Sequence, residues 1–231
     1  MEERSLRVCA QKLRDYLSLT LYKDVVQVFG VRDPAALEEL MLLLADASSS
    51  LVEESSLSNT LSLKLDTVKR YLDYLEAVFL ISRAEFYSKS RAARIRKRKK
   101  VYVTNVGLRN ALLGQLDESL LSDAAALGRV IETLVHEHCR RLQFHLSGPG
   151  ARIFYWRTPQ DHELDIVMEA ASRPVPAEVM SGDEVPSKKL RGLEEFEKEH
   201  HPPFSLIVTR NTLDLRGRRV YLPLWLFLLM C

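Results

Sequence analysis

The chain has 231 residues, of which 33 are Lys or Arg and 31 are Asp or Glu, and 46% of its residues are hydrophobic. This composition excludes a disordered tail, and the length allows one large domain or two small ones, each able to bury a core. The longest apolar run, residues 222–230, contains Pro223 and is far shorter than the roughly 18 to 20 residues that cross a bilayer. The N-terminus also lacks an apolar signal segment, so the sequence predicts a cytoplasmic protein without membrane contact.

The cysteines and histidines do not form a recognisable metal-binding motif. Cys9, Cys139 and Cys231 are odd in number and widely spaced, which fits neither a disulfide framework nor a zinc site made by cysteines alone. Free thiols in a reducing compartment are therefore expected. His136 and His138 lie two residues apart, so on a helix they point in different directions and cannot share one ion.

The basic residues are concentrated in one segment. Residues 89–100 read KSRAARIRKRKK and contain eight basic residues in twelve, with no acid. Without this segment, 25 basic residues face 31 acidic ones, so the rest of the chain is acidic. A concentrated basic patch is typical of a contact with a polyanion, and the alternative is a solvated, partly disordered loop.

The first half of the chain predicts helices followed by a two-stranded wing. Residues 1–29 have helical apolar spacing and predict one or two short helices. Asp33-Pro34 is typical of a helix start, a short helix follows in residues 55–61, and a strongly amphipathic helix opens at Asp66. Two β-type segments then flank the basic run, residues 77–87 and residues 100–103.

This order of elements is that of a winged helix-turn-helix domain, in which the third helix lies in the DNA major groove and the wing contacts the backbone. We therefore expect DNA as a partner, with phosphate contacts from the third helix and from the basic segment. The alternative is a domain that mediates only protein contacts. The predicted nucleic-acid-binding residues are Lys69, Arg70, Lys89, Arg91, Arg94, Arg96, Lys97, Arg98, Lys99 and Lys100.

The second half predicts an α/β domain, and the fold class of the whole chain is predicted as α/β (α+β). Helices are expected in residues 128–142 and 188–200. Strands are expected in residues 153–156, 164–168, 175–180 and 204–209, before a final segment, 220–230. The predicted domains are a helical linker (1–29), a winged helix (30–112) and the α/β domain (113–231).

Four carboxylates of this domain form the most informative pattern. Glu163 and Asp165 enter one strand, Glu178 lies on the next, and Glu132 lies on the helix before them. Alternation along a strand puts Glu163 and Asp165 on one face, and the two strands suit a hairpin. Converging acids hold Mg²⁺ or Mn²⁺ through oxygen ligands, so these four are candidate metal ligands for phosphodiester hydrolysis. Alternatively, they are solvent-facing or paired with nearby arginines.

The same region carries a family resemblance. The blocks GRVIETLV (128–135), YWRT followed four residues later by ELDIV (155–167), PAEVMS (176–181) and LPLWL (222–226) resemble the C-terminal region of a prokaryotic family of AAA-type ATPases. In that family a P-loop ATPase precedes a winged helix and a domain of unknown function similar to PD-(D/E)xK restriction-endonuclease-like nucleases. The blocks LYKDV (21–25), DTVKRYLDYLE (66–76) and KVYVTNVGL (100–108) extend the resemblance over the first half. It implies a winged helix followed by a restriction-endonuclease-like domain.

Three departures limit what the resemblance implies. The chain has no P-loop motif, so neither nucleotide binding by such a loop nor ATP hydrolysis is expected. The E-x-K motif of the family becomes Glu178-Val179-Met180, and a thioether cannot replace the lysine, although Lys188 or Lys189 could substitute for it. Asn105 stands where the family often has Asp, which predicts a structural role.

Three functions follow as hypotheses. The first is a DNA-binding protein whose nuclease-like domain is degenerate. Whether the protein is an enzyme is not predicted. The second is an active nuclease dependent on Mg²⁺ or Mn²⁺, with Glu132, Asp165 and Glu178 as catalytic residues and Lys188 or Lys189 as the displaced lysine. The third is a non-enzymatic module that associates with a separate ATPase chain. The oligomeric state is not predicted.

Overall fold

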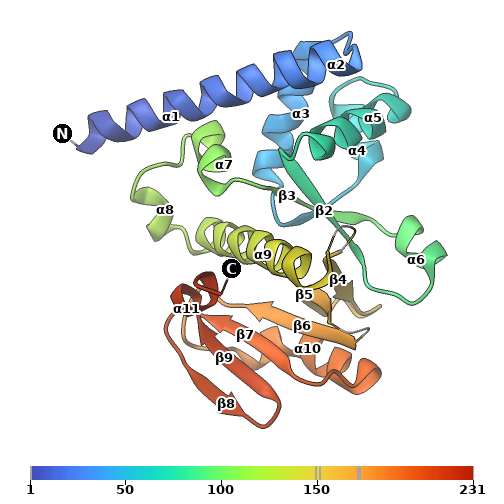
Figure 1. Cartoon of the computed structure of the whole chain (residues 1–231), viewed down its shortest axis with the longest axis vertical. Helices are drawn as coiled ribbons and strands as arrows, with labels where there is room; N and C mark the ends of the chain where they lie inside the picture. The colour runs from blue at the N-terminus through green and yellow to red at the C-terminus, as the bar shows by residue number, and fades with distance from the viewer. Residues whose placement is uncertain (1, 149, 151, 171–172, 231) are drawn as a thin grey trace. The chain divides into compact units, whose positions relative to one another are not determined.

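The computed structural model describes residues 2–148, 150, 152–170 and 173–230, so Cys231 lies outside the described residues. The chain forms two compact units whose segments are interleaved in sequence. The first unit comprises Met1–Arg83 and Lys99–Ala126, and the second comprises Ala84–Arg98 and Leu127–Cys231. Both contain helices and strands, so the protein has the mixed α/β composition that the sequence predicts (Figure 1). Within the described ranges, no helix is both long enough and apolar enough to cross a membrane.

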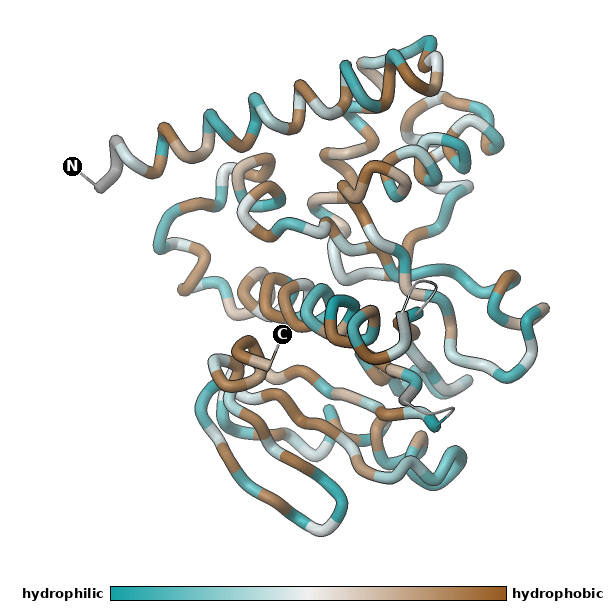
Figure 2. Tube along the Cα trace, in the orientation of Figure 1, coloured by the Kyte–Doolittle hydropathy of each residue, from teal (hydrophilic) through white to brown (hydrophobic). Residues whose placement is uncertain are grey.

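The first unit begins with a long helical segment. α1 (Glu2–Leu19) continues directly into the π-helix η1 (Thr20–Val26) and then α2 (Gln27–Phe29), where Gly30 ends the segment in a left-handed conformation. Figure 2 shows hydrophobic and hydrophilic residues alternating along α1. The prediction of one or two short helices for residues 1–29 therefore underestimated the length of this segment, because its amphipathic spacing continues past residue 19.

Three further helices and a small sheet contribute to this unit's core. They are α3 (Pro34–Asp46), α4 (Glu54–Thr60) and α5 (Leu65–Ala77). The Asp33 carboxylate accepts a hydrogen bond from the Ala36 amide at 3.0 Å, which is the expected cap of α3. The buried side chains of α5 pack with those of α3 in a single cluster, and they are Val68, Tyr71, Leu72 and Leu75.

The strands of this unit are β1 (Ser50–Val52), β2 (Ile81–Phe86) and β3 (Lys99–Val103), and β3 lies between the other two. β1 pairs antiparallel with β3 and was not predicted from the sequence. β2 begins four residues later than predicted, because residues 77–80 end α5 and form a turn in which Phe79 has a φ of 60°. Residues 84–86 of β2 belong to the second unit.

Two short helices follow β3. They are α7 (Val106–Leu113) and α8 (Ser119–Ser122). The Asn105 side chain accepts a hydrogen bond from the Leu108 amide at 2.9 Å and caps α7, which is the structural role expected of it.

The second unit is a sheet with helices on both faces. Its elements are α6 (Arg91–Arg96), most of α9 (Ala124–Ser147), β4 (Phe154–Arg157), β5 (Glu163–Ala170), β6 (Arg173–Val179), α10 (Ser187–His200), β7 (Ser205–Thr209), β8 (Asp214–Arg216), β9 (Arg219–Pro223) and α11 (Leu224–Leu228). The strand order is β2-β4-β5-β6-β7-β9-β8. β5 is antiparallel to β4 and β6, whereas β6, β7 and β9 run parallel.

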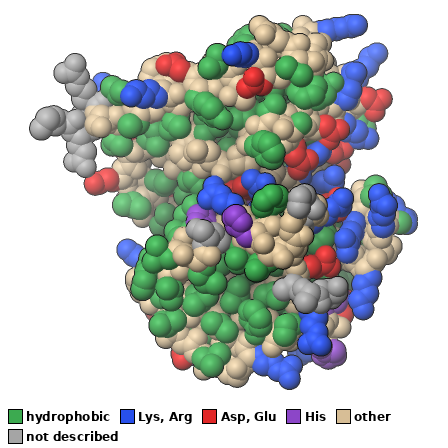
Figure 3. Space-filling model, in the orientation of Figure 1, with side chains coloured by type: hydrophobic (Ala, Val, Ile, Leu, Met, Phe, Trp, Pro, Cys, Tyr) green, Lys and Arg blue, Asp and Glu red, His purple; other side chains and the backbone are tan. Residues whose placement is uncertain are grey.

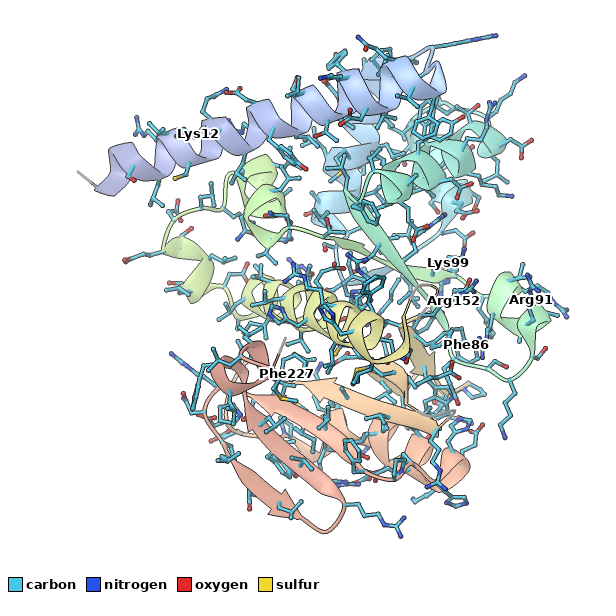
Figure 4. All side chains as sticks on the ribbon, viewed as in Figure 1. Lys12, Phe86, Arg91, Lys99, Arg152 and Phe227 are labelled. Atoms are coloured by element: carbon cyan, nitrogen blue, oxygen red, sulfur yellow. The ribbon has the colours of Figure 1, made fainter. Side chains whose placement is uncertain are left out.

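Each face of this sheet has its own apolar cluster. On one face, Ile166 and Ala177 pack with Cys139 of α9 and with Phe227 of α11. Phe227 is labelled in Figure 4. The opposite face packs against α10, and its cluster includes Trp156, Leu164, Met180, Leu193 and Phe196. The strands are therefore covered on both sides, as their nearly continuous apolar sequence requires.

Glu197 connects α10 to two strands. Its carboxylate accepts hydrogen bonds from the Ser205 hydroxyl at 2.7 Å and from the Arg219 guanidinium at 2.6 Å. Burial alone would raise the pKa of Glu197, but the hydrogen bonds from Arg219 and Ser205 outweigh it, so the pKa is below its usual value. A carboxyl whose pKa is lowered by folding stabilises the fold above its unfolded pKa, and this stabilisation is lost as the pH falls through the folded pKa.

Glu197→Gln is therefore expected to lower the free energy of unfolding by about 1 kcal/mol at pH 7, a value reduced for partial exposure to solvent. The difference from the native protein should shrink as the pH falls from 7 to about 2, because protonation of Glu197 through its lowered pKa makes it neutral like glutamine. Urea unfolding at the two pH values measures this. Glu194, whose carboxylate lies 3.7 Å from Arg219, is the matched control, and Glu194→Gln should change stability by less than about 0.5 kcal/mol. An equal loss for Glu197→Gln at both pH values would contradict the assignment.

Candidate functional site

The β5–β6 hairpin places Asp165 and Glu178 at neighbouring positions. Ile166 pairs with Ala177 across the two strands, so Asp165 and Glu178 each lie one residue beyond that pair. Asp165 Oδ2 accepts a hydrogen bond from the Val179 amide at 3.0 Å. Both carboxylates are buried, with 6% of Asp165 and 1% of Glu178 exposed. The turn residues 171–172 lie outside the described residues.

A β-bulge interrupts β5 at this point. Trp156 of β4 pairs with Leu164 and Phe154 pairs with Val167, so Asp165 and Ile166 together lie opposite one residue, Tyr155. Leu164 and Val167 both pack in the cluster on the α10 side, whereas Ile166 packs on the α9 side. Side chains therefore do not alternate strictly between the two faces of the sheet through residue 165. The expectation that Glu163 and Asp165 share one face assumed a regular strand, and β5 is irregular at this point. The extra residue explains why the Asp165 carboxylate reaches a main-chain amide of β6.

The other two predicted ligands lie in different surroundings. Glu163 is half-buried, and its Oε2 lies 3.8 Å from Nε of Arg157, whose guanidinium also binds the Asp161 carboxylate at 2.6 Å. Glu132 is half-buried on α9. Among the residues that the structure describes, no three His, Cys, Asp or Glu side chains lie close enough to hold one metal ion. The three-residue donor set of the expected Mg²⁺ or Mn²⁺ site is therefore not assembled among the described residues.

Residue 180, where the E-x-K motif of the family has its lysine, lies in apolar surroundings. Met180 is 5% exposed and packs with Leu193 and Phe196 of α10. Lys188 and Lys189 lie in the first turn of α10 and are exposed. Within the described part of the chain, neither amine forms an ion pair or hydrogen bond. The geometry therefore gives no support to either lysine as a substitute at the buried carboxylates.

The basic segment is ordered and has a helix in its centre. The Ser90 hydroxyl accepts a hydrogen bond from the Ala93 amide and caps α6. Blue side chains gather over α6 in Figure 3, and Arg91 points away from the sheet in Figure 4. The alternative of a disordered loop is therefore not what the structure shows.

Two of the eight cations in this segment are withdrawn from the surface. The Arg94 guanidinium lies 4.6 Å from the centre of the Phe154 ring, and its side chain is 23% exposed. Lys100 is 2% exposed on β3. Burial removes Lys100 from the predicted phosphate-binding set, because a buried ammonium cannot reach a polyanion, and Arg94 is mainly used in packing. Five cations are exposed: Lys89, Arg91, Arg96, Lys97 and Arg98, and Lys99 is half-buried.

The first unit presents a second group of cations. Lys69 and Arg70 are exposed on α5, as predicted. The Arg83 guanidinium binds Asp73 of α5 at 2.6 Å and also binds Glu76. These two acids are thus offset by Arg83, so they reduce the positive potential near Lys69 and Arg70 only weakly.

Sequence analysis did not single out Arg32, Lys64 or Thr67, which line a cavity of the first unit together with Arg70. The sequence does contain a signal that could have indicated two of them, a cation at a helix start. Arg32 immediately precedes the Asp33 cap of α3, and Lys64 is the N-cap residue of α5. Cations next to helix starts are unfavourably placed for the helix dipole. Their presence there is consistent with a role other than helix stability.

Comparisons with known proteins give two family matches and no solved structure. Residues 1–119 match a domain of unknown function, DUF8612, and residues 127–227 match another, DUF4143. DUF4143 is typically found in proteins associated with AAA-type ATPases, which agrees with the resemblance of the second half. No solved structure matches this chain.

The relatives are themselves uncharacterized. One protein of Mycobacterium bovis and one of Mycobacterium tuberculosis are each 32% identical over 165 residues, which cover 71% of this chain and 36% of theirs. A protein of Haemophilus influenzae is 32% identical over 97 residues, which cover 40% of this chain and 24% of its own. The chain thus spans about a third or less of the length of these curated relatives.

Proposed function

The chain belongs to the DUF8612 family of domains of unknown function, and from the geometry of its first unit we propose that it is a protein that binds duplex DNA. The order α3, β1, α4, α5, β2, β3, with β3 between β1 and β2, resembles that of a winged helix-turn-helix and supports the proposal. α5 would be the recognition helix. The observation that carries the proposal is the exposed Lys69–Arg70 pair on that helix.

The charge balance around α5 supports contact with phosphate. Lys69 and Arg70 are exposed, whereas the acid that follows them, Asp73, is bound by Arg83. Non-specific binding to DNA is dominated by such cations, which release counterions when they neutralise phosphates. The pair therefore contributes to affinity whatever the base sequence.

The basic segment, of which residues 89–98 belong to the second unit, supplies further cations. With Arg94 packed on Phe154 and Lys100 buried, at most six cations of this segment are available for phosphate contacts. The logarithm of the affinity contributed by this segment should therefore fall with the logarithm of the salt concentration at a slope no steeper than about −5. A steeper slope would require contributions from α5.

A double variant tests the role of α5. Lys69→Gln combined with Arg70→Gln is expected to weaken binding to a mixed-sequence duplex of about 20 base pairs roughly tenfold or more, and to reduce the salt slope by about 2, because two phosphate contacts are lost. Fluorescence anisotropy at several salt concentrations measures both quantities. The matched control removes the same charge from the same unit at Lys12, which Figure 4 labels, and Lys23, both exposed. Unchanged binding by the α5 variant, or an equal loss in the control, would contradict the proposal.

An alternative function is a metal-dependent nuclease. The order α9, β4, β5, β6, α10, β7, with Asp165 and Glu178 on adjacent strands, resembles that of a PD-(D/E)xK domain and favours this alternative. Met180 at the lysine position weighs against it. Cleavage of duplex and single-stranded DNA is measured with Mg²⁺ or Mn²⁺, and Glu178→Gln is the control. No cleavage by the native protein, or equal cleavage by both, would remove this alternative.

A second alternative is a module without enzyme activity that associates with a separate ATPase. The match of residues 127–227 to DUF4143 favours it, because that domain is typical of ATPase-associated proteins. Purification from the native host followed by mass spectrometry tests it. Recovery of the protein without any ATPase would count against this alternative.

A further inference from the structure

The first unit contains a cavity of about 520 Å³ between the end of α2, the start of α3 and one face of α5. Its walls come from residues 29–33, from residues 63–64 before α5, and from Thr67, Arg70, Tyr71 and Tyr74 on α5. Figure 1 shows α2 and α5 in this part of the unit. Small-molecule sites typically occupy about 300 to 1,000 Å³, whereas a lone inorganic phosphate would fill only a small part of this space.

The cavity is positively charged. Arg32, Lys64 and Arg70 line it and are exposed, and within the described part of the chain none of the three side chains forms an ion pair or hydrogen bond. One carboxylate also lines it, that of Asp33, but its oxygen already accepts the Ala36 amide at the start of α3. Three cations facing one acid favour a ligand that carries at least one negative charge.

An aromatic pair forms another part of the wall. The rings of Phe29 and Tyr74 are stacked, with centroids 4.2 Å apart and planes inclined by 9°. Phe29 is 36% exposed, so the pair is not sealed inside the core. Flat aromatic surfaces bind nucleobases through stacking that does not depend strongly on base identity.

We propose that this cavity binds a nucleoside 5′-phosphate, with the phosphate at Arg32, Lys64 and Arg70 and the base against the Phe29–Tyr74 pair. The hydroxyl of Thr67 is a further donor in the wall. The ligand is either a free nucleotide or the phosphorylated 5′ end of a DNA strand, which share this chemistry. This binding extends the proposed DNA binding and shares Arg70 with it, whereas Lys69 does not line the cavity.

Isothermal titration calorimetry with deoxyadenosine 5′-monophosphate tests the proposal, with deoxyadenosine and 2-deoxyribose 5-phosphate as probes that lack the phosphate and the base. Arg32→Gln combined with Lys64→Gln is expected to weaken binding of the nucleotide roughly tenfold or more, since two charge-assisted hydrogen bonds are lost. Lys69→Gln, at the residue next to Arg70 in sequence but outside the cavity lining, should leave the affinity for the nucleotide within about twofold.

Phe29→Leu separates the role of the base from that of the phosphate. It should weaken binding of the nucleotide roughly fivefold or more while leaving the affinity for 2-deoxyribose 5-phosphate within about twofold, because only stacking is lost. Single-stranded oligonucleotides with and without a 5′-phosphate distinguish the two sources of the ligand. Preference for the phosphorylated strand over the free nucleotide assigns the site to DNA ends, and the reverse assigns it to free nucleotide.

Two results would overturn the proposal. One is a dissociation constant for the nucleotide weaker than about 1 mM in the native protein. The other is equal binding by the native protein and the Arg32→Gln, Lys64→Gln variant. Duplex binding with 5′-hydroxyl ends is measured in parallel, so that its weakening in Lys69→Gln, without loss of nucleotide binding, separates this site from the duplex contact of Lys69.

Discussion

Met180→Lys is expected to lower the free energy of unfolding of the second unit by about 4 kcal/mol at pH 7, the cost of a lysine whose pKa is lowered by burial. The side chain at this position lies in an apolar cluster with Leu193 and Phe196. A lysine there is charged in the unfolded chain and must lose its proton or bury its charge on folding. Urea unfolding followed by tryptophan fluorescence measures the loss, because Trp156 and Trp225 both belong to the second unit.

The pH dependence of this loss has a definite sign. A lysine with a lowered folded pKa binds fewer protons in the native state than in the unfolded chain, so stability rises with pH. The loss should therefore shrink as the pH approaches the ordinary pKa of lysine. The size-matched control is Met180→Leu, which keeps the apolar volume and should cost less than about 1.5 kcal/mol.

The same variant decides between two of the proposed functions. If the buried carboxylates Asp165 and Glu178 held the new ammonium group, Met180→Lys would be as stable as the native protein at pH 7. Cleavage of DNA by this variant with Mg²⁺ would then favour the nuclease alternative, with an E-x-K sequence restored. A destabilised variant without cleavage agrees with a second unit in which residue 180 serves the core.

Gly192→Ala is expected to lower the free energy of unfolding by about 2 to 3 kcal/mol. A Cβ atom at this position of α10 would lie 2.0 Å from the carbonyl oxygen of Glu163 and 2.5 Å from its carbonyl carbon. Because both are main-chain atoms, α10 and the start of β5 would have to move apart. The gain of about 1 kcal/mol in helix propensity offsets only part of this cost. Urea unfolding followed by tryptophan fluorescence measures the change.

Gly128 of α9 is the matched control for this substitution. A Cβ atom there meets no described atom within 4 Å outside its neighbouring backbone. Gly128→Ala should therefore stabilise the protein by about 0.5 to 1 kcal/mol through helix propensity. If the two substitutions changed stability by the same amount, the close approach of α10 to Glu163 would not be the cause.

Local signals explain which elements the sequence predicted well. Asp33-Pro34 marks the start of α3, and the observed Asp33 cap forms within the same turn. β1 has no comparable signal, because its three residues become a strand only by pairing with β3. α6 was also missed, although Ser90 is a usable N-cap signal, because a run of cations dominates the segment.

The candidate site shows the same limit. The pairing of two acid-bearing strands was predictable from their spacing, and Asp165 and Glu178 do lie at neighbouring positions. The bulge was not predictable, since polar and apolar residues alternate normally over residues 163–166 and the extra residue appears only in the pairing with β4. In the same way, Arg94 and Lys100 look like the other cations of their run, and only tertiary packing shows that they are withdrawn from the surface.

The interleaving of the two units has a consequence during synthesis. Residues 84–98 belong to the second unit and include the end of β2. This end of β2 pairs with β4, which is translated only after residues 99–126 of the first unit. At about 5 to 20 residues per second, this segment waits for roughly seconds with an unpaired strand edge and exposed aromatic rings at Phe86 and Tyr87. Its six cations would repel other copies of the nascent chain during that interval and act as a gatekeeper against aggregation.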